Sequence, residues 1–300
     1  MDRLDELATF IAIVDAGNLT TAARRLQRSP PAVTRALAAL EQRLGARLIE
    51  RTTRRIAATE AGRRLADQAR RLLADYDETL RDAAGEQAAL AGLLRITAPL
   101  LFGRLHVMPV VSRFLDAHPA LRVELLLSDR NLDLIEEGLD VAIRIGSLPD
   151  SSLVSRRLGK VSRVLVASPT YIAAHGMPRT PSELTQHAII FTTGRATPLE
   201  WRFRIGTRER ALQLAPRLLV NQVDAALLAA REGRGIASAL SYQVADDLAS
   251  GQLLRILAAF EREPEPVQLV VPSARLMPRR VRAFIDHATA ALTSRLHAQS

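Results

Sequence analysis

From Leu93 onward, short apolar runs alternate with stretches of helical periodicity. The runs have the length and β-branched content of strands and cover residues 93–99, 121–128, 141–146, 161–168, 188–193, 218–221, 235–240 and 267–271. The stretches between and after them predict helices near 102–117, 131–138, 169–175, 181–185, 222–232, 242–250 and 278–296. This alternation is typical of an α/β domain with largely parallel sheets, so we expect most of the chain to fold in that way.

The first 58 residues have a different, all-helical pattern. An apolar stripe over 4–14 stops at Gly17, and a second short helix follows, with Asn18 or Thr20 as its cap. After a tight break, Pro30 opens a third helix that ends at Gly45. Two short helices joined in this way, the second with small and basic residues at its exposed amino end, predict a helix-turn-helix.

Charge is concentrated in the same region. Nine arginines and only two glutamates lie between residues 17 and 59, whereas the whole chain has a formal net charge of +9. Short strands at 48–49 and near Ile56 would flank a basic loop, which predicts a wing. A small structural bundle with a solvated basic face is the alternative, and the basic wing argues against it. The residues expected to contact DNA are Arg28, Ser29, Pro30, Pro31, Thr34, Arg35, Arg51, Thr53, Arg54 and Arg55.

A long helix is predicted from Thr59 to about residue 90. Its apolar positions recur at three- and four-residue steps and include Leu65, Leu72 and Leu80. About thirty residues would span roughly 45 Å, which is long for a small domain and suited to pairing with a second subunit. Packing of this helix on the rest of its own chain is the alternative.

A series of motifs in the first 62 residues resembles the LysR-type transcriptional regulators. The series comprises Ala22-Ala23-Arg24-Arg25-Leu26, Ser29-Pro30, Ala32-Val33-Thr34-Arg35, Leu40-Glu41, Leu44-Gly45, Arg47-Leu48, Arg51-Thr52-Thr53-Arg54 and Thr59-Glu60-Ala61-Gly62. Further matches, such as Ser128-Asp129-Arg130 and Asp140-Val141-Ala142-Ile143-Arg144-Ile145-Gly146, extend the resemblance over nearly the whole chain. Pro31, Ile49 and Ala58 depart from the family's usual residues without disturbing the series.

The resemblance implies three parts: a winged helix-turn-helix domain at 1–58, a dimerising linker helix at 59–90 and an effector-binding domain at 91–300. The effector domain would have two lobes like a periplasmic solute-binding protein, lobe I over about 93–162 and 268–300 and lobe II over about 163–267. Strand ends and helix amino termini should line a cleft between the lobes. The residues expected there are Thr97, Pro99, Leu100, Leu101, Phe102, Ser128, Arg144, Gly146, Ser147, Trp201, Asn221 and Gly235.

The expected function is transcription regulation through double-stranded DNA carrying an interrupted palindrome, controlled by a small organic effector, an anion rather than a cation. The working unit would be a homodimer or homotetramer, with RNA polymerase as a further partner. A solute-binding protein and an α/β enzyme fused to a DNA-binding module are the alternatives.

Several absences bear on these alternatives. The chain has no cysteine, which excludes disulfides, thiolate metal sites and thiol nucleophiles. It also lacks a G-x-S-x-G elbow, a Walker loop and an H-E-x-x-H motif, so we expect no catalytic residue, cofactor or metal. No export signal and no apolar run of membrane-spanning length occur, so the expected location is the cytoplasm and no membrane contact is expected.

Overall fold

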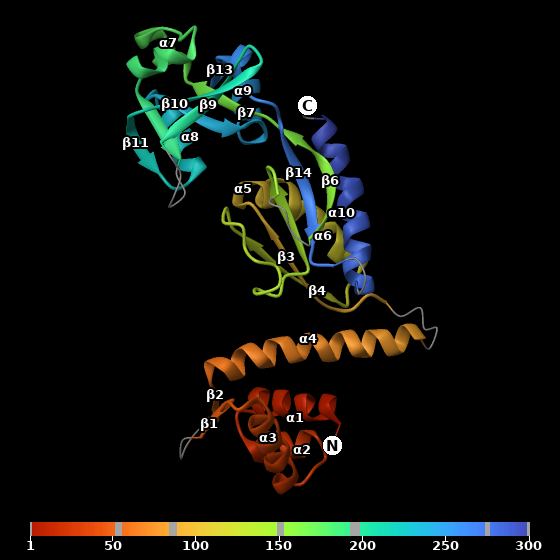
Figure 1. Ribbon diagram of the computed structural model, residues 1–300. Coiled ribbons are helices and arrows are strands. Elements are labelled where there is room, and N and C mark those ends of the chain that lie inside the picture. Colours follow the sequence, from red (N-terminus) through yellow and green to blue (C-terminus); the bar gives the residue numbers. More distant parts are fainter. Residues whose placement is uncertain are drawn as a thin grey trace. The chain divides into compact units, whose positions relative to one another are not determined.

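The chain folds into two compact units, and the first of them is mainly helical. The computed structural model describes residues 2–51, 56–83, 89–148, 153–192, 199–273 and 277–298, and the chain divides into two compact units, Met1–Gly92 and Leu93–Ser300 (Figure 1). The first unit contains α1 (Arg3–Ala16), α2 (Leu19–Arg25), α3 (Pro30–Leu44), β1 (Ile49–Arg51), β2 (Ile56–Ala58) and α4 (Glu60–Ala83).

The predicted caps lie where helices begin and end. The Asn18 side chain accepts a hydrogen bond from the Thr21 backbone N–H, and Gly17 and Gly45 end α1 and α3 in the left-handed conformation that glycine tolerates best. Ser29 is the N-cap residue of α3, but its side chain makes no capping hydrogen bond. The helix-turn-helix is therefore delimited as the sequence predicts.

The core of the first unit joins the three short helices to the wing and to α4. Its buried residues are Phe10, Ile13, Ala22, Ala23, Val33, Leu37, Leu40, Leu48, Ile49 and Ala66. Glu41 Oε1 accepts hydrogen bonds from the backbone N–H groups of Leu48 and Ile49, which fixes the start of the wing on α3. A Cβ on Gly62 would lie 2.0 Å from the Leu48 carbonyl oxygen, so only glycine permits this close packing of α4 on the wing.

The second unit is built on two five-stranded sheets, which we call lobe I and lobe II. The sheet of lobe I has the order β4-β3-β5-β14-β6, with β3 (Gly92–Ala98), β4 (Leu121–Leu127), β5 (Val141–Ile145), β6 (Val154–Val161) and β14 (Glu265–Val271). Its helices are α5 (Leu100–Phe102), α6 (Met108–Ala117) and α10 (Arg279–Ala298), with one turn of π-helix, η1 (Gly103–Val107), between α5 and α6. Phe114 on α6 meets Phe284 on α10 edge to face, with ring centroids 5.3 Å apart.

The sheet of lobe II has the order β11-β8-β12-β7-β13. Its strands are β7 (Arg163–Ala167), β8 (Ile189–Thr192), β11 (Pro216–Val220), β12 (Ile236–Leu240) and β13 (Leu254–Ile256). One face packs on α8 (Val223–Arg231) and α9 (Ala245–Ser250), and the other on α7 (Pro169–His175), η2 (Pro181–Gln186) and an antiparallel hairpin of β9 (Glu200–Ile205) and β10 (Arg208–Gln213). Two short 3₁₀ turns, η3 (Ser241–Gln243) and η4 (Ala258–Phe260), complete the lobe.

Two expectations for the second unit are wrong, and four of its strands were not expected. The sheets are mixed rather than largely parallel, because β7 runs antiparallel to β12 and β13, and β14 runs antiparallel to β5 and β6. The strands β6, β9, β10 and β13 were not predicted. Residues 134–138 form turns instead of a helix, because the Asp133 carboxylate accepts the backbone N–H groups of Ile135 and Glu136 and Gly138 then takes a positive φ. The same N–H groups lower the pKa of Asp133, with that of Glu136 contributing most.

Candidate nucleic-acid interface and effector cleft

The amino end of α3 is an open surface of small and basic residues. Ser29, Pro30, Pro31 and Arg35 are exposed, while Val33, Ala36, Leu37 and Leu40 on the opposite face are buried in the core. Thr34 is half-buried, and its hydroxyl donates to the Pro30 carbonyl oxygen over 3.0 Å. Short side chains around a long arginine allow close approach to a groove wall, and an arginine can reach the edge of a base.

Arg28, one of the predicted DNA contacts, is bound to residues of α1. Its guanidinium forms an ion pair with Asp5, with N and O 2.6 Å apart, and donates to the Thr9 hydroxyl over 3.2 Å. Both partners lie on α1, so Arg28 ties the turn to that helix, which the local sequence around 28–31 does not show. Arg43, at the other end of α3, also binds α1, because it forms an ion pair with the buried Glu6.

The wing is described only at its base. Arg51 is the last residue of β1, which pairs antiparallel with β2, and the predicted DNA contacts Thr53, Arg54 and Arg55 lie outside the described residues. Sequence reasoning left Arg24, Arg25 and Arg47 out of the candidate site, and all three are exposed. They belong to the same dense block of arginines between residues 17 and 59, and this block was the signal in the sequence that could have added them to the predicted DNA contacts.

The helix α4 exposes an apolar stripe on its second half. Leu72, Tyr76 and Leu80 are 50%, 45% and 51% exposed, whereas Ala66 and Ala69 nearer its start are buried. An ion pair between Arg70 and Asp15 and the burial of Ala66 fix the first half of α4 within the amino-terminal unit. The exposed stripe is what a helix needs in order to pair with another helix.

A polar cleft of about 250 Å³ opens between the two lobes of the second unit. Four of the residues expected in a cleft line it: Thr97, Pro99, Ser128 and Arg144. Lobe II contributes Arg163, Leu240, Tyr242 and Gln243, and Glu265 at the start of β14 completes the wall. The cleft therefore takes residues from both lobes, and a molecule bound there would contact both.

Hydrogen bonds between side chains and the backbone hold the polar groups of the cleft in place. The Asp129 carboxylate accepts from the Leu100 N–H over 3.0 Å, and the Ser128 hydroxyl accepts from the Arg130 N–H over 3.1 Å. The Arg144 guanidinium donates to the Leu132 carbonyl oxygen over 2.8 Å. These bonds make the lobe I wall a preformed surface.

An aromatic contact joins the lobes behind the cleft. The ring of Tyr242, from lobe II, meets both Phe102 and His106, from lobe I, with centroids 5.3 Å apart in each case. Burial raises the pKa of Tyr242, so its hydroxyl stays protonated. Burial and, to a lesser extent, the charge of Arg295 lower the pKa of His106.

Several expected cleft residues lie elsewhere. Leu101 and Phe102 are buried, Leu100 donates its backbone N–H to Asp129, and none of the three is among the residues that line the cleft. Gly146 hydrogen-bonds through its N–H to Pro266, and Ser147 and Asn221 are exposed outside the cleft wall.

Gly235 and Trp201 are also placed away from the cleft. Gly235 precedes the amino end of β12, where a Cβ would lie 2.3 Å from the Ala188 carbonyl oxygen, so close backbone packing explains this glycine. Trp201 lines a separate cavity within lobe II.

The mixed sheet explains why Arg163 was missed, whereas Tyr242 and Gln243 had a signal in the sequence. A search at carboxyl ends of parallel strands finds Ser128 and Thr97, but Arg163 stands at the amino end of the antiparallel β7. Tyr242 and Gln243 directly follow the predicted strand at 235–240, and that position was the available signal.

Two family models match the chain, and together they span nearly all of it. The "LysR substrate binding domain" matches residues 87–293, and "Bacterial regulatory helix-turn-helix protein, lysR family" matches residues 4–63. The chain belongs to the LysR family of transcriptional regulators. It is therefore a DNA-binding transcriptional regulator with an effector-binding domain, and this family consists of regulators rather than enzymes.

Curated relatives agree with the assignment to the LysR family. The HTH-type transcriptional regulator PtxR of Pseudomonas aeruginosa is 35% identical over 284 residues, which are 95% of this chain and 91% of that protein. The HTH-type transcriptional regulator DmlR of Escherichia coli is 31% identical over 284 residues, 94% of this chain and 92% of that protein.

Solved structures of LysR-type proteins share the fold. The full-length Vibrio cholerae virulence activator AphB matches with a TM-score of 0.60 and 29% identity, covering 96% of this chain and 99% of that one. CrgA, a LysR-type regulator from Neisseria meningitidis, matches with a TM-score of 0.62 and 27% identity, covering 96% and 98%. In the part of the chain that the structure describes, no helix is both long and apolar enough to cross a membrane.

Proposed function

We propose that this LysR-type regulator reads an interrupted palindromic operator as a homodimer or a dimer of dimers, and that a small organic anion in the cleft between the lobes alters that reading. The observation that carries the DNA-reading part is the open amino end of α3, where Arg35 is exposed beside Ser29, Pro30 and Pro31. Thr34 and Arg35 would reach base edges in the major groove.

Phosphate contacts would come from the wing and from the arginines around α3. Arg51, Arg54 and Arg55, with Thr53, remain proposed contacts to the backbone or to the adjacent minor groove, and Arg24, Arg25 and Arg47 join them because they are exposed in the same unit. Arg28 would act indirectly, since its ion pair with Asp5 holds the turn that presents α3.

Assembly would use the exposed stripe of α4. One helix-turn-helix reads too few bases for specificity in a genome, and two related half-sites require two heads related by symmetry. Leu72, Tyr76 and Leu80 supply an apolar seam for the helix of a second subunit. An assembly bound at a promoter would lie beside RNA polymerase, which we include among its partners. Because its target is chromosomal DNA, we place the protein in the cytoplasm.

The effector would bind across the cleft. Arg130, Arg144 and Arg163 give this wall three positive charges against the two carboxylates of Asp129 and Glu265. The hydroxyls of Thr97 and Ser128 would orient a carboxylate or carbonyl oxygen. A ligand that touches both lobes changes the equilibrium between lobe arrangements only to the extent that it prefers one of them.

A thermal-shift screen of small carboxylates and their neutral amides on the full-length protein tests the cleft. A true effector should raise the melting temperature of the wild type, and a Thr97→Val, Ser128→Ala variant should lose that response. The matched control is Ser147→Ala, which changes an exposed serine outside the cleft and should respond like the wild type. If none of the carboxylates that raise the wild-type melting temperature loses its effect in the double variant, the proposed effector site in the cleft is contradicted.

A further inference from the structure

A second and larger cavity lies within lobe II, apart from the cleft between the lobes. Its volume is about 470 Å³, which falls in the range of sites for small organic ligands. The lining residues come from the β7, β8 and β12 face of the sheet, from β9 of the hairpin and from the segment that follows β13. None of the wall comes from the sheet of lobe I, so the cavity does not require a particular arrangement of the lobes.

Aromatic and aliphatic side chains form the body of this cavity. Phe191 and Trp201 are stacked, with ring centroids 5.4 Å apart and planes 20° from parallel, and Leu165, Phe203 and Phe260 continue the apolar wall. These residues belong to, or pack against, one buried core cluster, so the wall is preformed. A flat or compact hydrocarbon ring fits such a surface better than water does.

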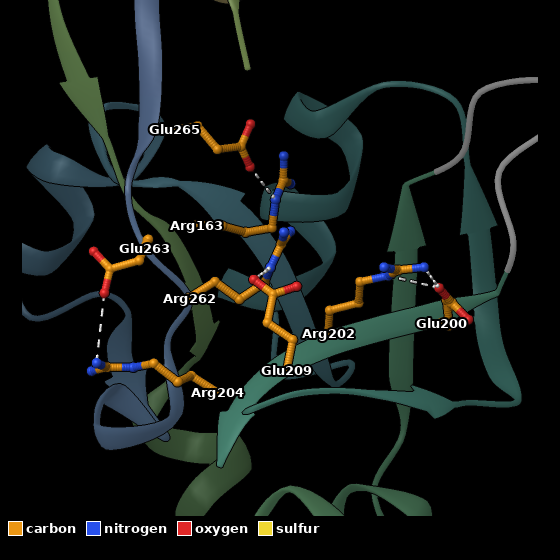
Figure 2. Close-up of polar contacts among 8 residues, drawn as sticks. All are labelled: Arg163, Glu200, Arg202, Arg204, Glu209, Arg262, Glu263 and Glu265. Carbon is orange, nitrogen blue, oxygen red and sulfur yellow. Dashed lines mark hydrogen bonds and ion pairs between the residues drawn. The ribbon is translucent and has the colours of Figure 1, made fainter. Parts of the chain in front are cut away.

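Several arginines lie at the rim of the cavity, and some of the glutamates that pair with them do not line it. Figure 2 shows the ion pairs of this region: Arg163 with Glu265, Arg262 with Glu209, Arg202 with Glu200 and Arg204 with Glu263. Arg202 and Glu200 both line the cavity and neutralise each other.

Arg163 and Arg262 differ from that pair. They line the cavity, but their partners Glu265 and Glu209 do not, so the cavity meets two cations with the balancing carboxylates outside its wall. Each of these pairs engages Nε, at 3.0 and 2.9 Å, and a guanidinium has further N–H donors for another acceptor. Glu261, which also lines the cavity, is bound by Arg255 through two hydrogen bonds.

We propose that this cavity of lobe II is a binding site for a small ring-containing carboxylate, with the ring against Phe191 and Trp201 and the carboxylate between Arg163 and Arg262. Arg163 also lines the cleft and stands where the chain crosses from β6 into β7, so a carboxylate bound to its remaining N–H groups shares this one positive charge with Glu265. Occupation of the cavity thereby weakens an ion pair at the crossover between the lobes. The proposal does not depend on which molecule binds in the cleft.

Trp201 is the only tryptophan in the chain and is therefore a built-in reporter of the cavity. The full-length protein is titrated with 4-tert-butylbenzoate, with the uncharged 4-tert-butylbenzamide and with acetate, and both Trp201 emission and calorimetric heat are followed. The benzoate should change the emission and bind about tenfold more tightly than the amide, because only its carboxylate forms charge-assisted bonds with arginine. Acetate, which has no ring, should not bind measurably.

Variants separate this site from the cleft and from general surface charge. In an Arg163→Gln, Arg262→Gln variant the preference for benzoate over benzamide should disappear, and Ser238→Leu, which fills the cavity from β12, should abolish the binding of both. The control Arg204→Gln removes an arginine of the same region that does not line the cavity and should bind like the wild type. Each variant's melting curve shows whether it is folded.

Three results would overturn the proposal. The first is the absence of binding by the benzoate at millimolar concentration. The second is a charge preference that survives in the double arginine variant. The third is binding that Ser128→Ala in the cleft abolishes while a folded Ser238→Leu protein retains it, because the ligand would then lie in the cleft.

Discussion

The roles of single residues in this regulator depend on tertiary contacts, and the local sequence indicates some of these contacts but not others. Gly62 is closely packed, since the Leu48 carbonyl oxygen occupies the place of a Cβ. Arg28, which is predicted to contact DNA, forms an ion pair with Asp5, a residue 23 positions earlier. A contact of that kind depends on how α1 packs against the turn between α2 and α3, and a short sequence motif does not indicate this packing.

Gly62→Ala should destabilise the amino-terminal unit by about 1–3 kcal/mol, because the new methyl group forces α4 away from the wing. Gly45→Ala is the matched control. Gly45 has φ +64 with open space around its Cβ, so its cost should be limited to about 1–2 kcal/mol of backbone strain and should leave the packing unchanged. Denaturant unfolding of both variants measures the difference, and equal losses accompanied by an unchanged α4–wing contact would argue against the close-packing explanation.

His106 should make the stability of the effector domain depend on pH. Burial is the main cause that lowers its pKa below the ordinary value of 6.5, so the unfolded chain binds the proton more readily than the folded one. The contribution of His106 to the free energy of unfolding is therefore fully present above about pH 6.5. It is lost as the pH falls through that value towards the pKa of the folded state. Unfolding free energy measured across this window should fall more steeply with acid for the wild type than for His106→Phe. Parallel curves would show that His106 carries no such dependence.

At the scale of elements, the sequence predicts the helices better than the strand pairing. The capped helices α1 to α3 and the runs that became β3, β5, β8 and β12 follow from local periodicity and turn residues. The edge strand β6 and the hairpin β9–β10 are rich in exposed charged residues, and only their partners in the sheet reveal them as strands. The expectation of parallel sheets failed for the same reason, because strand direction is set by long-range pairing.

The wrong expectation of parallel sheets explains why Arg163 was not predicted to line the cleft. The rule that ligands meet the carboxyl ends of parallel strands led to Thr97 and Ser128, and it misses Arg163 at the amino end of an antiparallel strand. Phe102 is predicted to face a ligand, and in the structure its side chain is buried, with its ring centroid 4.8 Å from that of His106.

Leu72→Asp should disrupt the proposed pairing of α4. The variant would place an unpaired charge in the apolar seam formed with Tyr76 and Leu80, and the subunit equilibrium should shift towards monomer. Leu72→Met keeps the apolar volume and should assemble like the wild type. Analytical ultracentrifugation at micromolar concentration distinguishes the two. A wild type that is monomeric both free and on DNA would contradict the assembly proposed here.

At the scale of the whole molecule, the two units have separate chemistry. The amino-terminal unit holds the dense arginine block and the open end of α3, and the second unit holds two hollows of different character, one polar and between the lobes, the other largely aromatic and within lobe II. A regulator built in this way can respond to ligand only if lobe arrangement and operator binding are energetically linked.

In the proposed dimer, two copies of α3 read DNA through Arg35. This role can be measured by selecting bound sequences from a random DNA library with the full-length protein and with Arg35→Ala. The wild type should enrich an interrupted palindrome, and Arg35→Ala should bind that sequence about 1–3 kcal/mol more weakly and lose preference at one symmetry-related position in each half-site. Enrichment of the same motif by both proteins with equal affinity, or of no palindrome by the wild type, would contradict it.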